Sequence, residues 1–298
     1  KYYQLTIVGG GPAGLSAGIY AARSRLSTLL IEKAGLGGRI LNAEIVENYP
    51  GFPQGVSGAE LGSLMAQQAE KQGLPTVIAE VQGLRIQGKE KIVDTNEGQY
   101  RAQAVIIAGG SEHSKLGVNG EEAFIGRGVS YCAMCDGAFF RDEVVAVVGG
   151  GNVALNDAIF LTRFASKVIV IHRRDQLRAT KILQDRAFNH PKIEFIWDTV
   201  VDSIAGDKQV RELTLRSVKT GEKSNLNVSG VFLAVGLRPN TGYLKGLLTL
   251  DEVGFISVND QMETEVPGLF AAGDIRAGSI RQIVSAVGDG ATAAIAAE

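Results

Sequence analysis

The two cysteines of the chain stand three residues apart, as Cys132 and Cys135. They are the only cysteines among 298 residues, which excludes a framework of several structural disulfides. A tetrahedral zinc site needs four ligands, and the three histidines, at positions 113, 172 and 190, do not have a zinc-binding spacing. We therefore predict that the cysteine pair is redox-active, and we expect no metal site.

A glycine-rich segment occurs twice, at residues 7–14 and 147–154, with a constant offset of 140 residues. Each copy contains an apolar strand, a glycine turn, a helix and a second apolar strand, which is the βαβ fingerprint of a dinucleotide site. The first glycine permits the tight turn, the second leaves room for a pyrophosphate, and the third small residue lets the helix pack closely on the strand. We expect the phosphates at each helix N-terminus, where unpaired N–H groups favour anions. The residues assigned to these contacts are Gly9, Gly11, Pro12, Ala13, Gly14, Gly149, Gly151 and Asn152.

The residues that end the second strand differ between the two copies. Glu32 in the first copy is a carboxylate that accepts hydrogen bonds from a ribose diol and repels a 2′-phosphate. The second copy has His172, Arg173 and Arg174 at this place, followed by Arg178, a cluster that binds a 2′-phosphate. We therefore predict NADP(H) at the second site and an adenine dinucleotide at the first. A flavin mediates between a hydride donor and a dithiol, so FAD is the expected occupant of the first site.

These segments, with residues 47–53, 130–137 and 268–274, resemble the motifs of low-molecular-weight thioredoxin reductases over essentially the whole chain. The resemblance implies an α/β fold with two Rossmann-like dinucleotide-binding domains of the three-layer ββα type. The FAD domain would be discontinuous, comprising residues 1–112 and 242–298. The NADPH domain, residues 113–241, would be inserted into it and would carry the cysteines.

The resemblance also implies roles for individual residues. Cys135 would face the flavin, Cys132 would attack the disulfide of a protein substrate, and Asp136 would act as general acid. The remaining FAD contacts would come from Gly38, Asn48, Gly273, Asp274, Arg281 and Gln282. The family uses thioredoxin as substrate, is typically homodimeric, and turns its NADPH domain relative to its FAD domain during the reaction.

The composition narrows the function classes further. The net charge is −2 and the sequence pI is about 6.0, so nucleic acid and anionic membranes are not expected as partners. We find no targeting segment and no apolar run long enough to span a membrane, and we expect a soluble, cytoplasmic protein. The 38 glycines have no collagen-like period, so we interpret the excess as loops that approach cofactors.

Several positions depart from the family pattern and leave alternatives open. Arg39 stands where glutamine is usual, and residues 152–153 and 156–157 differ on the helix of the second site. The same relay could act on another small disulfide protein, or could use a donor other than NADPH. A third interpretation is that the chain is a nucleotide-binding redox sensor that shows no turnover.

The rest of the pattern predicts local structure. Apolar residues at helical spacing indicate a helix from about residue 61 that ends at Gly73. The runs 104–108 and 231–235 are expected to be further parallel strands. Residues 210–218 and 225–231 alternate as antiparallel strands do.

Overall fold

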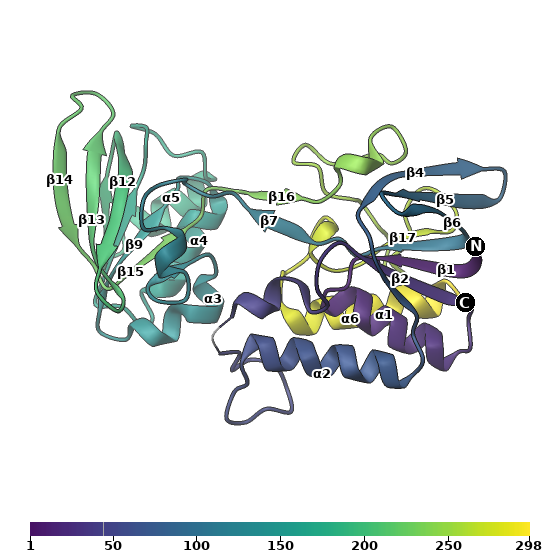
Figure 1. The fold of residues 1–298 in the computed structure, drawn as a ribbon. Helices are drawn as coiled ribbons and strands as arrows, with labels where there is room; N and C mark the ends of the chain where they lie inside the picture. The colour runs from purple at the N-terminus through teal and green to yellow at the C-terminus, as the bar shows by residue number, and fades with distance from the viewer. Residues whose placement is uncertain (44) are drawn as a thin grey trace. The chain divides into compact units, whose positions relative to one another are not determined.

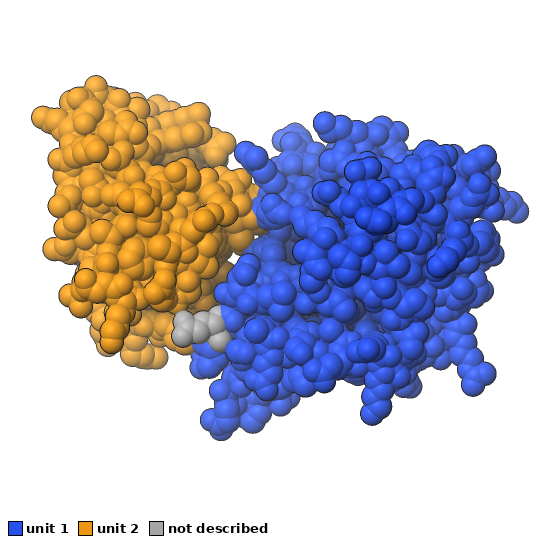
Figure 2. Space-filling view, viewed as in Figure 1, with its two compact units in different colours: residues 1–112, 238–298 blue, residues 113–237 orange. Residues whose placement is uncertain are grey.

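The computed structural model describes residues 1–43 and 45–298. Its chain divides into unit 1, residues 1–112 and 238–298, and unit 2, residues 113–237 (Figure 2). Residues 238–241, which the sequence analysis grouped with the second domain, belong to unit 1 by this division. The assignment of FAD to one unit and NADPH to the other stays a prediction.

Unit 1 is built on a mixed sheet with the strand order β3-β2-β1-β6-β5-β4, in which β17 also pairs with β6. Strands β3, β2, β1, β6 and β17 run parallel, whereas β4 and β5 join in antiparallel fashion. The strands are β1 (Tyr2–Val8), β2 (Thr28–Glu32), β3 (Thr76–Ile78), β4 (Val81–Gln87), β5 (Glu90–Thr95), β6 (Gly98–Ile107) and β17 (Leu269–Ala271). The helices are α1 (Pro12–Arg23), η1 (Gly38–Asn42), α2 (Gly58–Lys71), η4 (Gly242–Leu244), η5 (Gly273–Ile275) and α6 (Ile283–Ala296).

The core of unit 1 lies on both faces of this sheet because the C-terminal halves of its central strands β1 and β6 are mostly apolar. Leu5 and Ile7 pack with α1, α2 and α6, which lie together on one side of the sheet in Figure 1. Val8, Val105 and Ile107 pack on the other face. Alternate side chains of a strand point to opposite faces, so a strand covered on both faces is apolar at every position.

Unit 2 has three layers. Its central sheet is parallel, with the order β11-β10-β9-β15-β8, and a separate antiparallel sheet has the order β12-β13-β14. Residues of α4, such as Leu155, pack on one face of the parallel sheet, and residues of β12 and β13, such as Val201 and Leu213, pack on the other. This arrangement is the predicted ββα layering.

The elements of unit 2 follow one another in the order expected for the second βαβ copy. Its strands are β8 (Val129–Ser130), β9 (Val144–Val148), β10 (Lys167–Ile171), β11 (Ile193–Ile196), β12 (Thr199–Gly206), β13 (Val210–Ser217), β14 (Lys223–Asn227) and β15 (Gly230–Leu233). Its helices are η2 (Glu122–Phe124), α3 (Ala133–Asp136), η3 (Gly137–Phe140), α4 (Asn152–Leu161) and α5 (Lys181–Phe188). The chain passes between the units in β7 (Ser111–His113) and β16 (Leu237–Pro239), which form a two-stranded sheet.

Most local predictions are confirmed, and one is corrected. Helix α2 covers the predicted helical stripe, β6 and β15 are parallel strands, and β13 is antiparallel. Residues 225–231 do not form one antiparallel strand. They divide between β14 and β15, because Gly230 and Val231 pair in parallel with β9 and continue the central sheet.

Candidate active site and cofactor sites

The cysteine pair forms a disulfide at the start of the short helix α3. The Cα atoms of Cys132 and Cys135 are 5.3 Å apart. Cys132 has extended backbone at the N-cap of α3, and its sulfur accepts a hydrogen bond from the N–H of Cys135 at 3.1 Å. The pair therefore lies at the start of a single helical turn, in which the N–H of Cys135 is a donor that favours a thiolate over a thiol at Cys132. Cys135 is exposed and Cys132 is half-buried.

The carboxyl of Asp136 follows the pair directly and is held by Ser130. The Ser130 hydroxyl donates to Asp136 Oδ2 at 2.6 Å and accepts the N–H of Cys132 at 3.0 Å. Burial raises the pKa of Asp136 above its ordinary value, and the hydrogen bond from Ser130 acts in the opposite direction. A carboxyl with a raised pKa retains its proton closer to neutral pH, which suits a proton donor.

Tyr131, the residue before Cys132, is held in place by contacts with Glu121 and His113. Its hydroxyl donates to Glu121 Oε1 at 2.7 Å, and its ring stacks on His113 with the centroids 4.7 Å apart. Glu121 is buried and also accepts the backbone N–H groups of residues 116 and 117. Burial raises the pKa of Tyr131, and the Glu121 carboxylate raises it further, so the phenol stays protonated. The redox loop is thus tied to the segment that follows β7.

The first glycine turn has the geometry of a pyrophosphate loop. Gly9 has φ +109°, a conformation that favours glycine, and its N–H bonds to the carbonyl of Ile31. A Cβ at Gly14 would lie 1.8 Å from the Gly9 carbonyl oxygen, so only glycine permits this approach of α1. Helix α1 begins after Gly11 with Pro12 in its first turn and has no side-chain cap. Its first N–H groups are therefore directed at the space beside Gly11.

Glu32 lies at the end of β2, where the sequence predicts a contact to the ribose. Its Oε2 accepts the N–H of Gly10 at 2.6 Å, and its Oε1 accepts the N–H of Ala34 at 3.0 Å. The carboxylate is thus fixed at the edge of the glycine turn. Each of its oxygens has a second lone pair, so the predicted role as acceptor for a ribose diol is compatible with these bonds.

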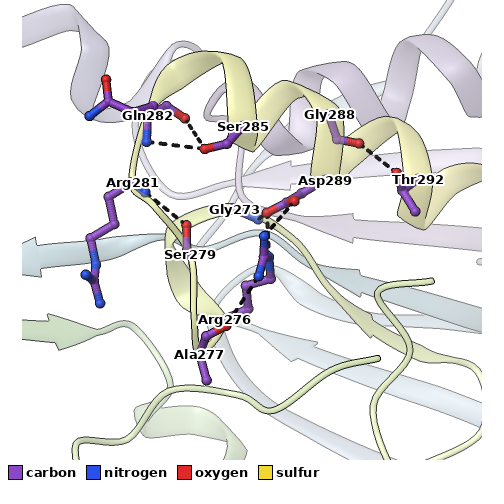
Figure 3. Close-up of polar contacts among 10 residues, drawn as sticks. All are labelled: Gly273, Arg276, Ala277, Ser279, Arg281, Gln282, Ser285, Gly288, Asp289 and Thr292. Atoms are coloured by element: carbon purple, nitrogen blue, oxygen red, sulfur yellow. Dashed lines mark hydrogen bonds and ion pairs between the residues drawn. The ribbon is translucent and has the colours of Figure 1, made fainter. Parts of the chain in front are cut away.

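The segment that follows β17 is held to α6 by polar contacts (Figure 3), and a Cβ at Gly273 would lie 2.9 Å from the Cβ of Ala13 in α1. Asp289 of α6 holds Arg276 by two bonds, of 2.6 Å to Nε and 2.9 Å to Nη2, and accepts the N–H of Gly273 at 3.0 Å. In Figure 3 the side chain of Arg281 points away from this pair. Gln282 caps α6 and accepts from Asn48 Nδ2 at 3.1 Å, so two of the predicted flavin contacts meet directly.

Gly38, Arg39 and Asp274 converge on the same turn. The backbone of Gly38 lies against that of Gly11. Arg39 Nη1 donates to the Ser111 carbonyl at 3.0 Å and lies 3.5 Å from Asp274 Oδ2. Burial raises the pKa of Asp274, and the positive charges of Arg39 and Arg281 oppose that rise.

The second glycine turn repeats the geometry of the first in unit 2. A Cβ at Gly149 would lie 2.6 Å from the Ala234 carbonyl, and α4 begins after Gly151 without a side-chain cap. Asn152 Oδ1 accepts the N–H of Thr180 at 2.8 Å, and the N–H of Arg178 bonds to the Gly150 carbonyl. The loop that carries the basic residues is therefore fixed to the glycine turn.

His172 and the three arginines of this loop differ in accessibility. His172 is buried with its ring against Gly150, and its Nε2 lies 3.1 Å from the Gln176 carbonyl. Burial lowers the pKa of His172; the contact with the Gln176 carbonyl acts in the opposite direction, and the neighbouring arginines add to the lowering, so the ring is neutral at neutral pH. Arg173, Arg174 and Arg178 are exposed and stay charged. The three arginines are therefore accessible to a ligand, whereas the His172 ring packs against the glycine turn.

Comparison with known proteins agrees with this geometry. The family model of the pyridine nucleotide-disulphide oxidoreductases matches residues 3–290. The chain belongs to this family. Thioredoxin reductase of Bacillus subtilis (strain 168) is 48% identical over 296 residues, which cover 99% of this chain and 93% of that protein.

Solved structures resemble this oxidoreductase over the same length. The thioredoxin reductase of Streptococcus pyogenes MGAS5005 is 48% identical, with a TM-score of 0.95, and the match covers 99% of this chain and 97% of that one. A ferredoxin-flavin thioredoxin reductase from Clostridium acetobutylicum is 33% identical, with a TM-score of 0.53 and coverages of 99% and 96%.

The structure of this oxidoreductase also identifies residues that sequence reasoning did not assign. Ser130 lies in the motif at residues 130–137, but no role was assigned to it from the sequence. No sequence pattern pointed to the Asp289 carboxylate on α6, because its partners lie 13 and 16 residues away. Within residues 1–43 and 45–298, no group of three or more His, Cys, Asp or Glu side chains could hold a metal ion. No helix in that part of the chain is long and apolar enough to cross a membrane.

Proposed function

We propose that this chain is a thioredoxin reductase, which uses NADPH, FAD and the Cys132–Cys135 disulfide to reduce the disulfide of thioredoxin. The observation that carries the proposal is the disulfide at the N-terminus of α3, in a chain with two dinucleotide turns. The high identity to thioredoxin reductases over the full chain supports the same substrate. We also propose a homodimer in the cytoplasm, following the family pattern.

Both cofactors fit the residues present. At Gly11 a Cβ would meet nothing nearer than Gly38 Cα at 3.9 Å, and at Gly151 nothing within 4 Å, so there is open space beside both helix N-termini. The buried hydroxyl of Ser111, next to Arg39, has no hydrogen-bond partner among the described residues, which suits a site completed by a polar ligand. When bound, NADPH supplies a hydride and FAD passes its electron pair to the disulfide.

The residues of unit 1 would hold FAD. The first turn, Gly9 to Gly14, would bind the pyrophosphate, and Glu32 would accept from the adenosine ribose. Asp274 would accept from the ribityl chain. The pair formed by Asp289 and Arg276 keeps Gly273 and its neighbour Asp274 in place.

The redox chemistry would proceed by thiol–disulfide exchange once the pair is reduced. The thiolate of Cys132 attacks one sulfur of the thioredoxin disulfide, forms a mixed disulfide and releases the other sulfur as a thiolate. Cys135 then attacks Cys132, which restores the disulfide of this chain and releases the second thioredoxin sulfur. Asp136 donates a proton to a thiolate at this site. The net reaction consumes NADPH and one proton and yields NADP⁺ and a dithiol.

The experiment that tests the proposal is turnover of the yellow holoprotein with NADPH and the thioredoxins of its own host, followed by insulin reduction. We expect Cys132→Ser and Cys135→Ser each to lose this activity, because either change removes the exchange couple, and to keep bound flavin. The control is Ser166→Ala, which removes an exposed hydroxyl of unit 2 and should leave activity unchanged. Full activity in either cysteine variant, or turnover with another disulfide protein and no host thioredoxin, would contradict the proposal.

A second candidate uses ferredoxin as the electron donor, as the name of the Clostridium acetobutylicum relative suggests. The exposed arginines 173, 174 and 178 beside the second glycine turn favour NADPH, because a ferredoxin-dependent enzyme has no need to bind a 2′-phosphate. We expect the double variant Arg173→Ala and Arg174→Ala to raise the KM for NADPH at least about tenfold and to change the KM for NADH much less.

The matched control for this variant is Arg211→Ala, which removes an arginine from an exposed ion pair elsewhere in unit 2. We expect it to change neither Michaelis constant. Equal effects of the double variant on both nucleotides would refute the assignment of the 2′-phosphate to Arg173 and Arg174.

A further inference from the structure

Ser130 ends strand β8, two residues before the redox pair, and is almost completely buried. A serine hydroxyl has one proton to donate. Two acceptors lie near it: Asp136 Oδ2 at 2.6 Å and the Cys132 carbonyl at 3.4 Å. The shorter contact has the length expected for a hydroxyl that donates to a carboxylate, so the proton of Ser130 is directed to Asp136.

The same oxygen accepts the backbone N–H of Cys132 at 3.0 Å. Asp136 in turn donates its own backbone N–H to the Cys132 carbonyl at 3.1 Å. These three bonds close a ring that joins the strand end, the first cysteine and the carboxyl. The hydrogen bond from Ser130 is the only one that the Asp136 carboxyl makes among the described residues, and it leaves Oδ1 without a proton donor there.

We propose that Ser130 is a positioning residue for the redox reaction: its hydroxyl orients the Asp136 carboxyl through Oδ2 for proton transfer at the cysteine pair. The inference rests on the proposed role of Asp136 as proton donor. Removal of the hydroxyl takes a hydrogen bond away from the ionised carboxyl and therefore favours the protonated form.

Charged side chains on the elements that pack against α3 do not account for the pKa shift of Asp136. Helix α3 packs against η3 and α4 within unit 2. The segment Gly137–Phe140 of η3 has no titratable side chain, and α4 has only Asp157. The pKa of Asp136 responds to burial and to Ser130, and that of Asp157 to burial, so neither carboxyl depends on the charge of the other.

The test compares pH profiles of thioredoxin reduction for the wild-type holoprotein, Ser130→Ala, Ser130→Thr and Asp136→Asn. The limb of the pH–rate profile that disappears in D136N identifies the titration of Asp136. We expect that limb to move up by about one pH unit in S130A and to remain in place in S130T, which keeps a hydroxyl. Thr162→Val is the matched control, because it removes another buried hydroxyl of unit 2, bonded to the Ile159 carbonyl, and should leave the limb in place.

The outcomes separate the inference from the function on which it rests. If D136N keeps the wild-type rate and both limbs, the proposed role of Asp136 fails and the role of Ser130 fails with it. If D136N loses a limb of the pH profile, but S130A lowers the rate and leaves that limb at its wild-type pH, Ser130 has only a structural role and the inference alone is overturned. Should S130A not fold, Ser130→Gly also removes the hydroxyl and is judged by the same limb.

Discussion

Replacement of Asp289 by asparagine should loosen unit 1, for which we propose FAD binding. The carboxylate accepts two bonds from Arg276 and one from the N–H of Gly273, and the two charged side chains are only 18% and 9% exposed. Asparagine keeps the shape but places an NH2 group against an arginine donor. Arg276 then retains a buried charge without a counterion, a change that costs about 3–5 kcal/mol in other proteins.

The effect can be measured as a shift in urea unfolding. With an m-value of about 2 kcal/mol per molar urea, this loss corresponds to a fall of about 1.5–2.5 M in the midpoint. Release of flavin, followed by its fluorescence, reports unit 1. The single tryptophan, Trp197, lies in unit 2 and reports that unit in the same sample. We expect Asp289→Asn to shift the flavin transition strongly and the tryptophan transition much less.

The control is Glu90→Gln, which removes a carboxylate from an ion pair of unit 1 in which Arg101 is 56% and Glu90 38% exposed. Exposed pairs contribute about 0.2–1 kcal/mol, so its midpoint should fall by less than about 0.5 M. A flavin transition in Asp289→Asn that shifts no more than this control would refute the claim that the buried pair stabilises the segment at Gly273.

Two further predictions concern buried charge. Burial raises the pKa of Asp157 to about 7, well above the ordinary value of about 4 for an aspartate, so its contribution to stability is present below about pH 4 and is lost as the pH rises from there through 7. Asp157→Asn should therefore gain stability relative to the wild type between pH 4 and 7, by at most about 1.4 kcal/mol per pH unit in urea unfolding; a constant difference would contradict this. Arg39→Gln removes the cation beside Asp274 and should weaken FAD binding to the apoprotein about two- to fivefold, measured by quenching of flavin fluorescence. Unchanged affinity would exclude a contribution of Arg39 to that site.

Much of the architecture could be predicted because short stretches of sequence specify it. The two glycine turns were identified from spacing alone, and in the structure both lie between a parallel strand and a helix that lacks a side-chain cap. The helix that ends before Gly73 followed from apolar periodicity. The antiparallel strand predicted at residues 225–231 is confirmed for residues 225–227 and wrong for Gly230 and Val231, because alternation indicates an exposed strand whereas Val231 is completely buried in the central sheet.

The candidate site was predicted less completely. The family resemblance indicated that Asp274 and Gln282 would contact FAD but not which side chains they would meet. Arg39 lies 3.5 Å from Asp274, although 235 residues separate them, and Asn48 bonds to Gln282 across 234 residues. His172 was grouped with the arginines as a phosphate ligand, but its ring is buried against Gly150, and only its accessibility in the structure distinguishes it from them.

By itself the sequence determined the kind of chemistry: a pair of cysteines at a spacing that permits a disulfide, and two turns whose glycines admit a pyrophosphate. These features depend on backbone conformations within a few residues, which local sequence specifies. Tertiary structure decided how each charged group is held, namely Asp136 by Ser130, Asp289 by Arg276, and Asp274 beside Arg39. Burial and hydrogen bonding set the protonation of a carboxyl, and burial arises only when strands and helices from different parts of the sequence pack together.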